Sequence, residues 1–173
     1  MVTFLTLTGV RSTDEEEGES MSDILLAIDP GKATGYAFVD LAHNMVFESG
    51  ECTFDETCKL LTSMASHYKS TMHIVSESFI INANTVKNTQ APWSLELIGV
   101  ARWVSRVYTG RDLVLQAPAA AKRFSSDDKL KQLGWHSPGK GHANDAARHL
   151  LLRLASTGKL SNAVLTSLVS DGL

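Results

Sequence analysis

The chain has 173 residues, 43% of them hydrophobic and 20% charged, which is typical of one soluble globular domain with a buried core. No apolar run approaches the roughly 18 residues of a membrane span, and the N-terminal MVTFLTLTGV lacks the basic flank of a signal peptide. We therefore expect a cytoplasmic protein without a membrane partner. Cys52 and Cys58 fit neither a Cys-x-x-Cys pair nor zinc-ligand spacing, and are expected to be free thiols.

The net charge of −3 is unevenly distributed along the chain. Residues 21–100 carry 4 basic and 9 acidic residues, whereas residues 101–160 carry 11 basic and 4 acidic residues. A basic half on a nearly neutral chain favours a polyanionic partner that contacts one face. A solvated basic surface without a partner is the alternative.

The first 20 residues are expected to be a disordered acidic tail, because RSTDEEEGES is polar and has no apolar periodicity. Either this tail is a flexible part of the protein or Met21 is its biological start, and we favour the second interpretation. Residues 21–173 then form one domain.

From Met21 onward, the pattern predicts strands and helices that alternate. Expected strands are 24–28, 35–40, 45–49, 72–79 and 112–117, with His43-Asn44 as the turn between the second and third. Expected helices are 55–68 with Asp55 as N-cap, 94–108 starting at Ser94, 142–156, and a short one over 161–170. An order β-β-β-α-β-α-β-(α)-α predicts an α/β fold, a mixed sheet with helices on both faces.

Acidic residues follow two strands that read as buried. Asp29 comes directly after ILLAI, and Glu77 ends HIVSE. Ligands of such sheets gather at the carboxyl ends of the central strands, so we expect these carboxylates near each other. His142 and Asp145, three residues apart, lie on one face of the last helix.

These four side chains could form a cage of oxygen and nitrogen ligands for Mg²⁺ or Mn²⁺, with two ions activating water and stabilising the leaving oxygen of a phosphodiester. Each residue also has a structural explanation. Asp29 could start the Pro-Gly turn, and Glu77 could pair with a lysine. Asp145 could interact favourably with the helix dipole, and His142 could be a surface residue. His149, one turn beyond Asp145, is expected to pack or to support the site.

The segments AIDPGKATGYA, VSESFIINANTVKNTQAPWSLELIGVARW, QAPAAAKRF and HANDAARHLLL resemble the RuvC family of Holliday junction resolvases in the RNase H-like superfamily, and the resemblance covers about residues 24–155. The resemblance implies a β-β-β-α-β-α-β-α core in which Asp29, Glu77, His142 and Asp145 bind the metal. Many family members have aspartate where His142 stands, and histidine favours Mn²⁺. The resemblance also implies a homodimer that cleaves branched DNA, such as four-way junctions, in recombination and repair in a bacterial or phage-infected cell.

A DNA-contacting surface follows from the same resemblance and from the basic residues, which neutralise phosphates. Lys122 resembles an active-site lysine of the family, and Phe79 the aromatic residue that probes the junction centre. The residues expected to contact DNA are Lys32, Phe79, Asn84, Lys87, Lys122, Arg123, Lys129 and Lys140. The polar region 80–93 would be a DNA-contacting loop or a plain connection, and Trp103 is expected in the core or at a dimer interface.

The sequence therefore predicts a metal-dependent endonuclease, with Lys122 stabilising charge on the phosphate. A phosphate-binding P-loop is excluded, because no glycine stands five residues before Gly31-Lys32. A fragment of an actin-like ATPase would need a second domain. A nuclease acting on flaps, forks or RNA, and a DNA-binding module without catalysis, stay open, because a metal site does not define the substrate.

Overall fold

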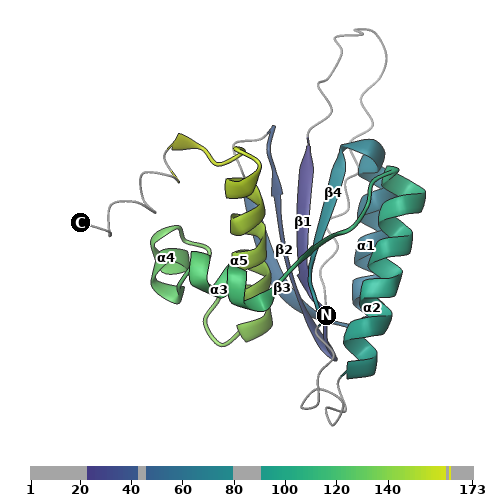
Figure 1. Cartoon of the computed structure of the whole chain (residues 1–173), viewed down its shortest axis with the longest axis horizontal. Helices are drawn as coiled ribbons and strands as arrows, with labels where there is room; N and C mark the ends of the chain where they lie inside the picture. The colour runs from purple at the N-terminus through teal and green to yellow at the C-terminus, as the bar shows by residue number, and fades with distance from the viewer. Residues whose placement is uncertain (1–22, 43–45, 80–90, 163, 165–173) are drawn as a thin grey trace, which may run out of the picture.

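The computed structural model describes residues 23–42, 46–79, 91–162 and 164, which form a five-stranded sheet covered by helices (Figure 1). The strands are β1 (Ile24–Asp29), β2 (Ala33–Asp40), β3 (Val46–Thr53), β4 (Met72–Glu77) and β5 (Val114–Gln116). The helices are α1 (Phe54–Tyr68), α2 (Ala91–Val104), α3 (Pro118–Phe124), α4 (Asp127–Gln132) and α5 (Gly141–Ser156). A 3₁₀ turn, η1 (Lys69–Thr71), follows α1, and a π-helical turn, η3 (Ser105–Thr109), follows α2.

The sheet is mixed, and its strand order is β3-β2-β1-β4-β5. β1, β2 and β3 form an antiparallel meander, whereas β4 lies parallel to β1 and β5 parallel to β4. Ile28 pairs with Ser76 in this register, so Asp29 and Glu77 end neighbouring strands at the same edge of the sheet. The predicted fold class, an α/β fold built on a mixed sheet, is confirmed.

β1 is buried on both faces, as its continuous apolar run predicts. Leu25 and Ala27 pack under α5 in one cluster, while Leu26 and Ile28 pack in a second cluster with residues of α1 and α2. Helices α1 and α2 thus cover one face of the sheet and α5 the other, with α3 and α4 outside α5 (Figure 1). None of the helices in the described ranges is long and apolar enough to cross a membrane.

Two sequence predictions about helices are wrong. The N-cap of α1 is Thr53, not Asp55: Thr53 Oγ1 accepts from the N–H of Glu56, and the Glu56 carboxylate accepts from the N–H of Thr53. This reciprocal capping box satisfies two N–H groups, which a lone Asp55 could not. Helix α2 begins at Ala91 rather than Ser94, whose hydroxyl instead donates to the carbonyl of Pro30 (2.8 Å).

Other boundaries shift by a few residues. β3 continues to Thr53, β5 covers only Val114–Gln116, and regular α-helix in α2 ends at Val104, after which η3 continues to Thr109. Cys52 and Cys58 are free, as expected. The acidic tail, the His43-Asn44 turn and most of the helix expected at 161–170 lie outside the described residues.

Candidate active site

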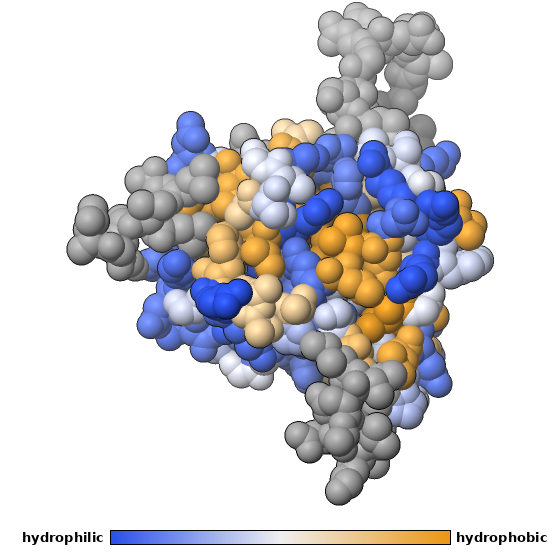
Figure 2. Space-filling view, viewed as in Figure 1, coloured by the Kyte–Doolittle hydropathy of each residue, from blue (hydrophilic) through white to orange (hydrophobic). Residues whose placement is uncertain are grey.

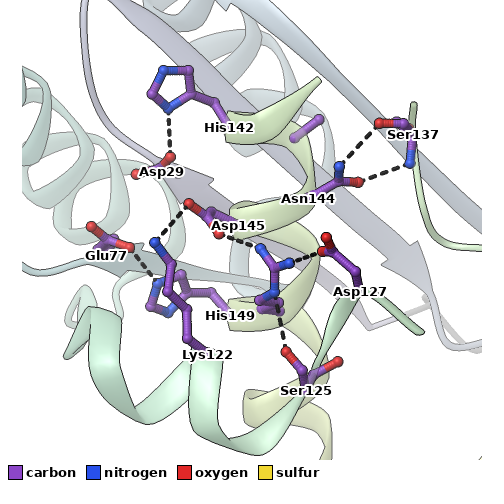
Figure 3. A network of polar contacts seen from close by, with 12 residues as sticks. Asp29, Glu77, Lys122, Ser125, Asp127, Ser137, His142, Asn144, Asp145 and His149 are labelled. Atoms are coloured by element: carbon purple, nitrogen blue, oxygen red, sulfur yellow. Dashed lines mark hydrogen bonds and ion pairs between the residues drawn. The ribbon is translucent and has the colours of Figure 1, made fainter. Parts of the chain in front are cut away.

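Asp29 is a buried carboxylate at the end of β1, with 7% of its surface exposed. Burial and the negative charge of Glu77 raise its pKa to about 6, against a partial compensation by His142. Oδ2 of Asp29 lies 2.8 Å from Nδ1 of His142 (Figure 3). A carboxylate that is buried and repelled by other carboxylates is one that a bound cation would stabilise.

His142 is the second residue of α5 and is held there by β3. Its backbone N–H donates to Oε1 of Glu51 (3.0 Å), and the N–H of Ala143 donates to the same oxygen (3.5 Å). Glu51 thereby caps α5, which has no side-chain cap of its own. Partial burial lowers the pKa of His142, but the hydrogen bond to Asp29 and the charges of Asp29, Glu51 and Asp145 raise it more, so the net shift is upward.

The first turn of α5 lies directly on β2, and Gly35 makes that contact possible. A Cβ atom on Gly35 would lie 1.9 Å from the carbonyl oxygen of His142 and 2.7 Å from the nitrogen of Ala143. Any larger residue would push α5 away from the sheet. Gly35 pairs with Asp29 across the β1–β2 ladder, so this contact also sets the spacing between Asp29 and His142.

Glu77 ends β4 and contacts a second histidine of α5. Nε2 of His149 lies 2.9 Å from Oε2 of Glu77, and its Nδ1 lies 2.9 Å from Oε1 of Gln116, the last residue of β5 (Figure 3). His149 is 1% exposed. The described partner of Glu77 is therefore this histidine and not a lysine, and His149 holds the carboxylate rather than only filling space.

Asp145 lies between two cations. Its Oδ2 is 3.2 Å from Nζ of Lys122, and its Oδ1 accepts from Nη1 of Arg148. Arg148 also donates to Asp127 on α4 and to the carbonyl of Ser125 (Figure 3). Arg148 was not among the predicted site residues, and its i+3 spacing from Asp145 is the one sequence signal that points to it.

The four predicted ligands thus come to one edge of the sheet, where both Glu77 and Asp145 act electrostatically on Asp29. Within the described ranges, however, no three His, Cys, Asp or Glu side chains lie close enough together to hold a metal ion. Each carboxylate faces its own basic partner instead. Carboxylate oxygens with imidazole nonetheless form a donor set that suits Mg²⁺ or Mn²⁺.

The residues expected to contact DNA are spread around this edge. Lys32 is exposed between β1 and β2, Lys122 and Arg123 are exposed on α3, and Lys140 is exposed directly before α5. Lys129 on α4 and Phe79 after β4 are half-buried, whereas Asn84 and Lys87 lie outside the described residues.

A hollow of about 490 Å³ lies beside Asp145 and is lined by residues of α3, α4 and α5, among them Lys122, Asp127 and Asn144. A larger hollow of about 690 Å³, lined by Asp23, Trp135 and Lys159, lies at the opposite end of β1. The smaller hollow, bordered by Lys122 and Arg148 as well as Asp145, is therefore the one that adjoins the candidate site.

Trp103 is 55% exposed, so its expected place in the core is wrong, while an interface role stays a prediction. It belongs to an exposed apolar stripe on one side of α2 and η3, hereafter the α2 stripe, formed by Leu95, Trp103 and Val107. Trp103 is eight residues after Leu95 and four before Val107, spacings that keep neighbouring members on one side of the helix. Figure 2 shows apolar surface over α2 and over the neighbouring segment that contains β5, where Leu115 is exposed.

Comparison with known proteins gives a structural neighbour but no sequence relative. No protein-family model matches the chain, and no curated protein sequence matches it. Among solved structures, the chain is similar to Thermus thermophilus RuvC, described as "T. thermophilus RuvC in complex with Holliday junction substrate". The TM-score is 0.55 at 15% identity, over 79% of this chain and 96% of the RuvC chain. At this identity the similarity establishes a shared fold.

Proposed function

We propose that the protein is a divalent-metal-dependent endonuclease that cleaves branched DNA, and that its substrate is the four-way junction. The observation that carries the proposal is the meeting of Asp29 and Glu77, from adjacent strand ends, with His142 and Asp145 of α5 at one sheet edge. The likeness in fold to a RuvC bound to a Holliday junction supports the choice of substrate.

Asp29, Glu77, His142 and Asp145 would hold one or two Mg²⁺ or Mn²⁺ ions. When bound, the metal supplies an activated water and stabilises the leaving oxygen of the phosphodiester. The pKa of Asp29 is raised to about 6, and a bound cation would stabilise its charged form. His142, whose pKa is raised, is held against Asp29 and orients it.

Lys122 is placed to interact with the phosphate. Its side chain is 57% exposed and contacts Asp145, so its ammonium group can move a short way to a DNA phosphate without breaking buried contacts. Arg123 and Lys140 extend the basic surface around the hollow beside Asp145. Such contacts neutralise phosphates and make binding sensitive to salt.

A homodimer would present two such sites to a four-way junction. The exposed α2 stripe supports the proposal that the protein forms a dimer. Leu95, Trp103 and Val107 expose their side chains between 42% and 58% on one helix face, which is unusual for a surface helix facing only water. A second copy of the same helix is the occupant we propose, because a two-fold axis pairs identical surfaces.

The test is a cleavage panel of four-way junctions, flaps, forks, plain duplex and RNA–DNA hybrids, with the nick positions mapped. Wild-type protein with Mn²⁺ or Mg²⁺ should nick junctions in symmetric pairs, and Asp145→Asn should bind junctions but cleave none. Single nicks at flaps or forks would make it a nuclease of another substrate class. Binding without cleavage by the wild type in either metal would make it a DNA-binding module.

A further inference from the structure

One arginine next to the candidate site is nearly buried, and its guanidinium donates hydrogen bonds to three separate acceptors. Arg148 is 13% exposed. Its Nε donates to the carbonyl of Ser125 (3.1 Å), its Nη1 to Oδ1 of Asp145, and its Nη2 to Oδ1 of Asp127. Figure 3 shows Ser125, Asp127 and Asp145 around the guanidinium group. Three separate acceptors fix a planar guanidinium in both position and orientation.

The two oxygens of Asp145 have partners of very different strength. Oδ1 is bound by Arg148, whose side chain is 13% exposed, whereas Oδ2 contacts Lys122, whose side chain is 57% exposed. An exposed lysine pair contributes little and exchanges with solvent, while a buried arginine contact is hard to break. Oδ2 is therefore the oxygen of Asp145 that is available to bind a cation, whereas Oδ1 stays bound to Arg148.

The same side chain joins two parts of the fold. Ser125 and Asp127 belong to the α3–α4 segment, which carries Lys122, Arg123 and Lys129, while Arg148 and Asp145 belong to α5. Helices α3 and α4 have only 7 and 6 residues, too few to be stable alone, so their placement depends on tertiary contacts. The guanidinium fixes this basic segment relative to the Asp145 carboxylate.

We propose that Arg148 is a positioning residue, which orients Asp145 so that Oδ2 faces a divalent cation and which holds the basic α3–α4 segment beside it. The inference rests on the proposed function in taking Asp145 as a metal ligand. It adds a residue that touches neither metal nor phosphodiester. Lysine at this position would keep the charge and lose the fork that reaches three acceptors.

The test measures Mn²⁺ binding to the DNA-free protein by calorimetry, together with kcat and KM on a junction. Arg148→Lys should weaken Mn²⁺ binding by about 10- to 100-fold, as the loss of a group that orients a metal ligand does. It should lower kcat on the junction more than it raises KM, because the basic α3–α4 segment is loosened while its own DNA-contacting side chains stay in place. Arg153→Lys, the same change later on α5, should stay within about twofold of wild type in every quantity.

Asp127→Asn weakens the hold on Arg148 from its exposed side, and so acts on Asp145 indirectly. It serves as the second variant if Arg148→Lys folds poorly. It should weaken Mn²⁺ binding in the same direction but less. Combined with Arg148→Lys it should add almost nothing, because both changes act through one chain of contacts.

Three results would overturn the inference. A raised KM with unchanged Mn²⁺ affinity would make Arg148 a DNA contact, and a lowered melting temperature with unchanged Mn²⁺ affinity would make it a fold support only. Equal Mn²⁺ binding by wild type and Asp145→Asn would remove the premise and the proposed ligand set with it. In the first two cases the proposed nuclease function stands, so the two failures can be told apart.

Discussion

Asp29→Asn should make the metal-free protein more stable at neutral pH while it abolishes cleavage. In the wild type, a carboxylate with 7% exposure is kept beside Glu77 and Asp145, and its pKa is raised from 3.8 to about 6. Asparagine has nearly the same shape, carries no charge to desolvate, and can still hydrogen-bond to His142. The substitution thus removes an electrostatic cost and leaves the packing intact.

The size of the effect follows from the pKa shift. A pKa raised from 3.8 to about 6 corresponds to about 3 kcal/mol, which is the most that asparagine can recover at pH 7.5. Because the folded-state pKa is raised, the favourable contribution of the neutral carboxyl is fully present below about pH 4 and is lost as pH rises through about 6. The raised pKa of His142 has the same sign, and it shrinks in the variant because the carboxylate that raises it is gone.

The assay is urea unfolding of both proteins between pH 4 and 7.5, without and with Mn²⁺. The difference in free energy of unfolding should be near zero at pH 4 and grow to at most about 3 kcal/mol by pH 7.5 in favour of the variant. Added Mn²⁺ should stabilise the wild type and not the variant. Asp55→Asn, an exposed carboxyl in the first turn of α1, is the control and should change stability by less than about 1 kcal/mol at every pH. A variant that is equally or less stable than wild type at pH 7.5 would refute the electrostatic reasoning.

Three further outcomes are expected. Gly35→Ala should lower stability by about 1–3 kcal/mol and cleavage by on the order of 100-fold, because α5 must move off β2. Gly50→Ala, whose new Cβ would meet only the movable end of the Tyr36 ring, should have a much smaller effect. Thermal unfolding and initial cleavage rates measure the two effects. Trp103→Glu should convert a dimer to a monomer in sedimentation equilibrium while Arg102→Glu does not, and a wild-type monomer would remove the dimer proposal. His142→Asp should shift the ratio of Mn²⁺- to Mg²⁺-supported cleavage toward Mg²⁺, and an unchanged ratio would show that this residue is not a ligand.

Local patterns in the sequence were enough to predict the main elements around the site. The run ILLAI predicts a strand buried on both faces, and the spacing of apolar residues predicts the helix that became α5. Both rest on side-chain periodicity within a few neighbouring residues. The placement of Asp29 and Glu77 follows from the same patterns, because each directly ends its strand.

At two places the local sequence pattern allowed two alternatives, and only the tertiary structure distinguished between them. Either Thr53 or Asp55 can cap a helix, and only the length of β3 decides that α1 begins at Phe54. The apolar side of α2 could face its own sheet or a second chain, and Trp103 is in fact exposed. Periodicity reports that a face is apolar but not what covers it.

By itself, then, the sequence determined which strands and helix carry Asp29, Glu77 and Asp145, because secondary structure follows from short-range pattern. Only the tertiary structure decided the partners of these carboxylates. His142 reaches Asp29 across 113 positions of the chain and His149 reaches Glu77 across 72. Contacts at such separations depend on sheet register and on how closely α5 approaches β2, and those are set by the packing of the whole domain rather than by any local pattern.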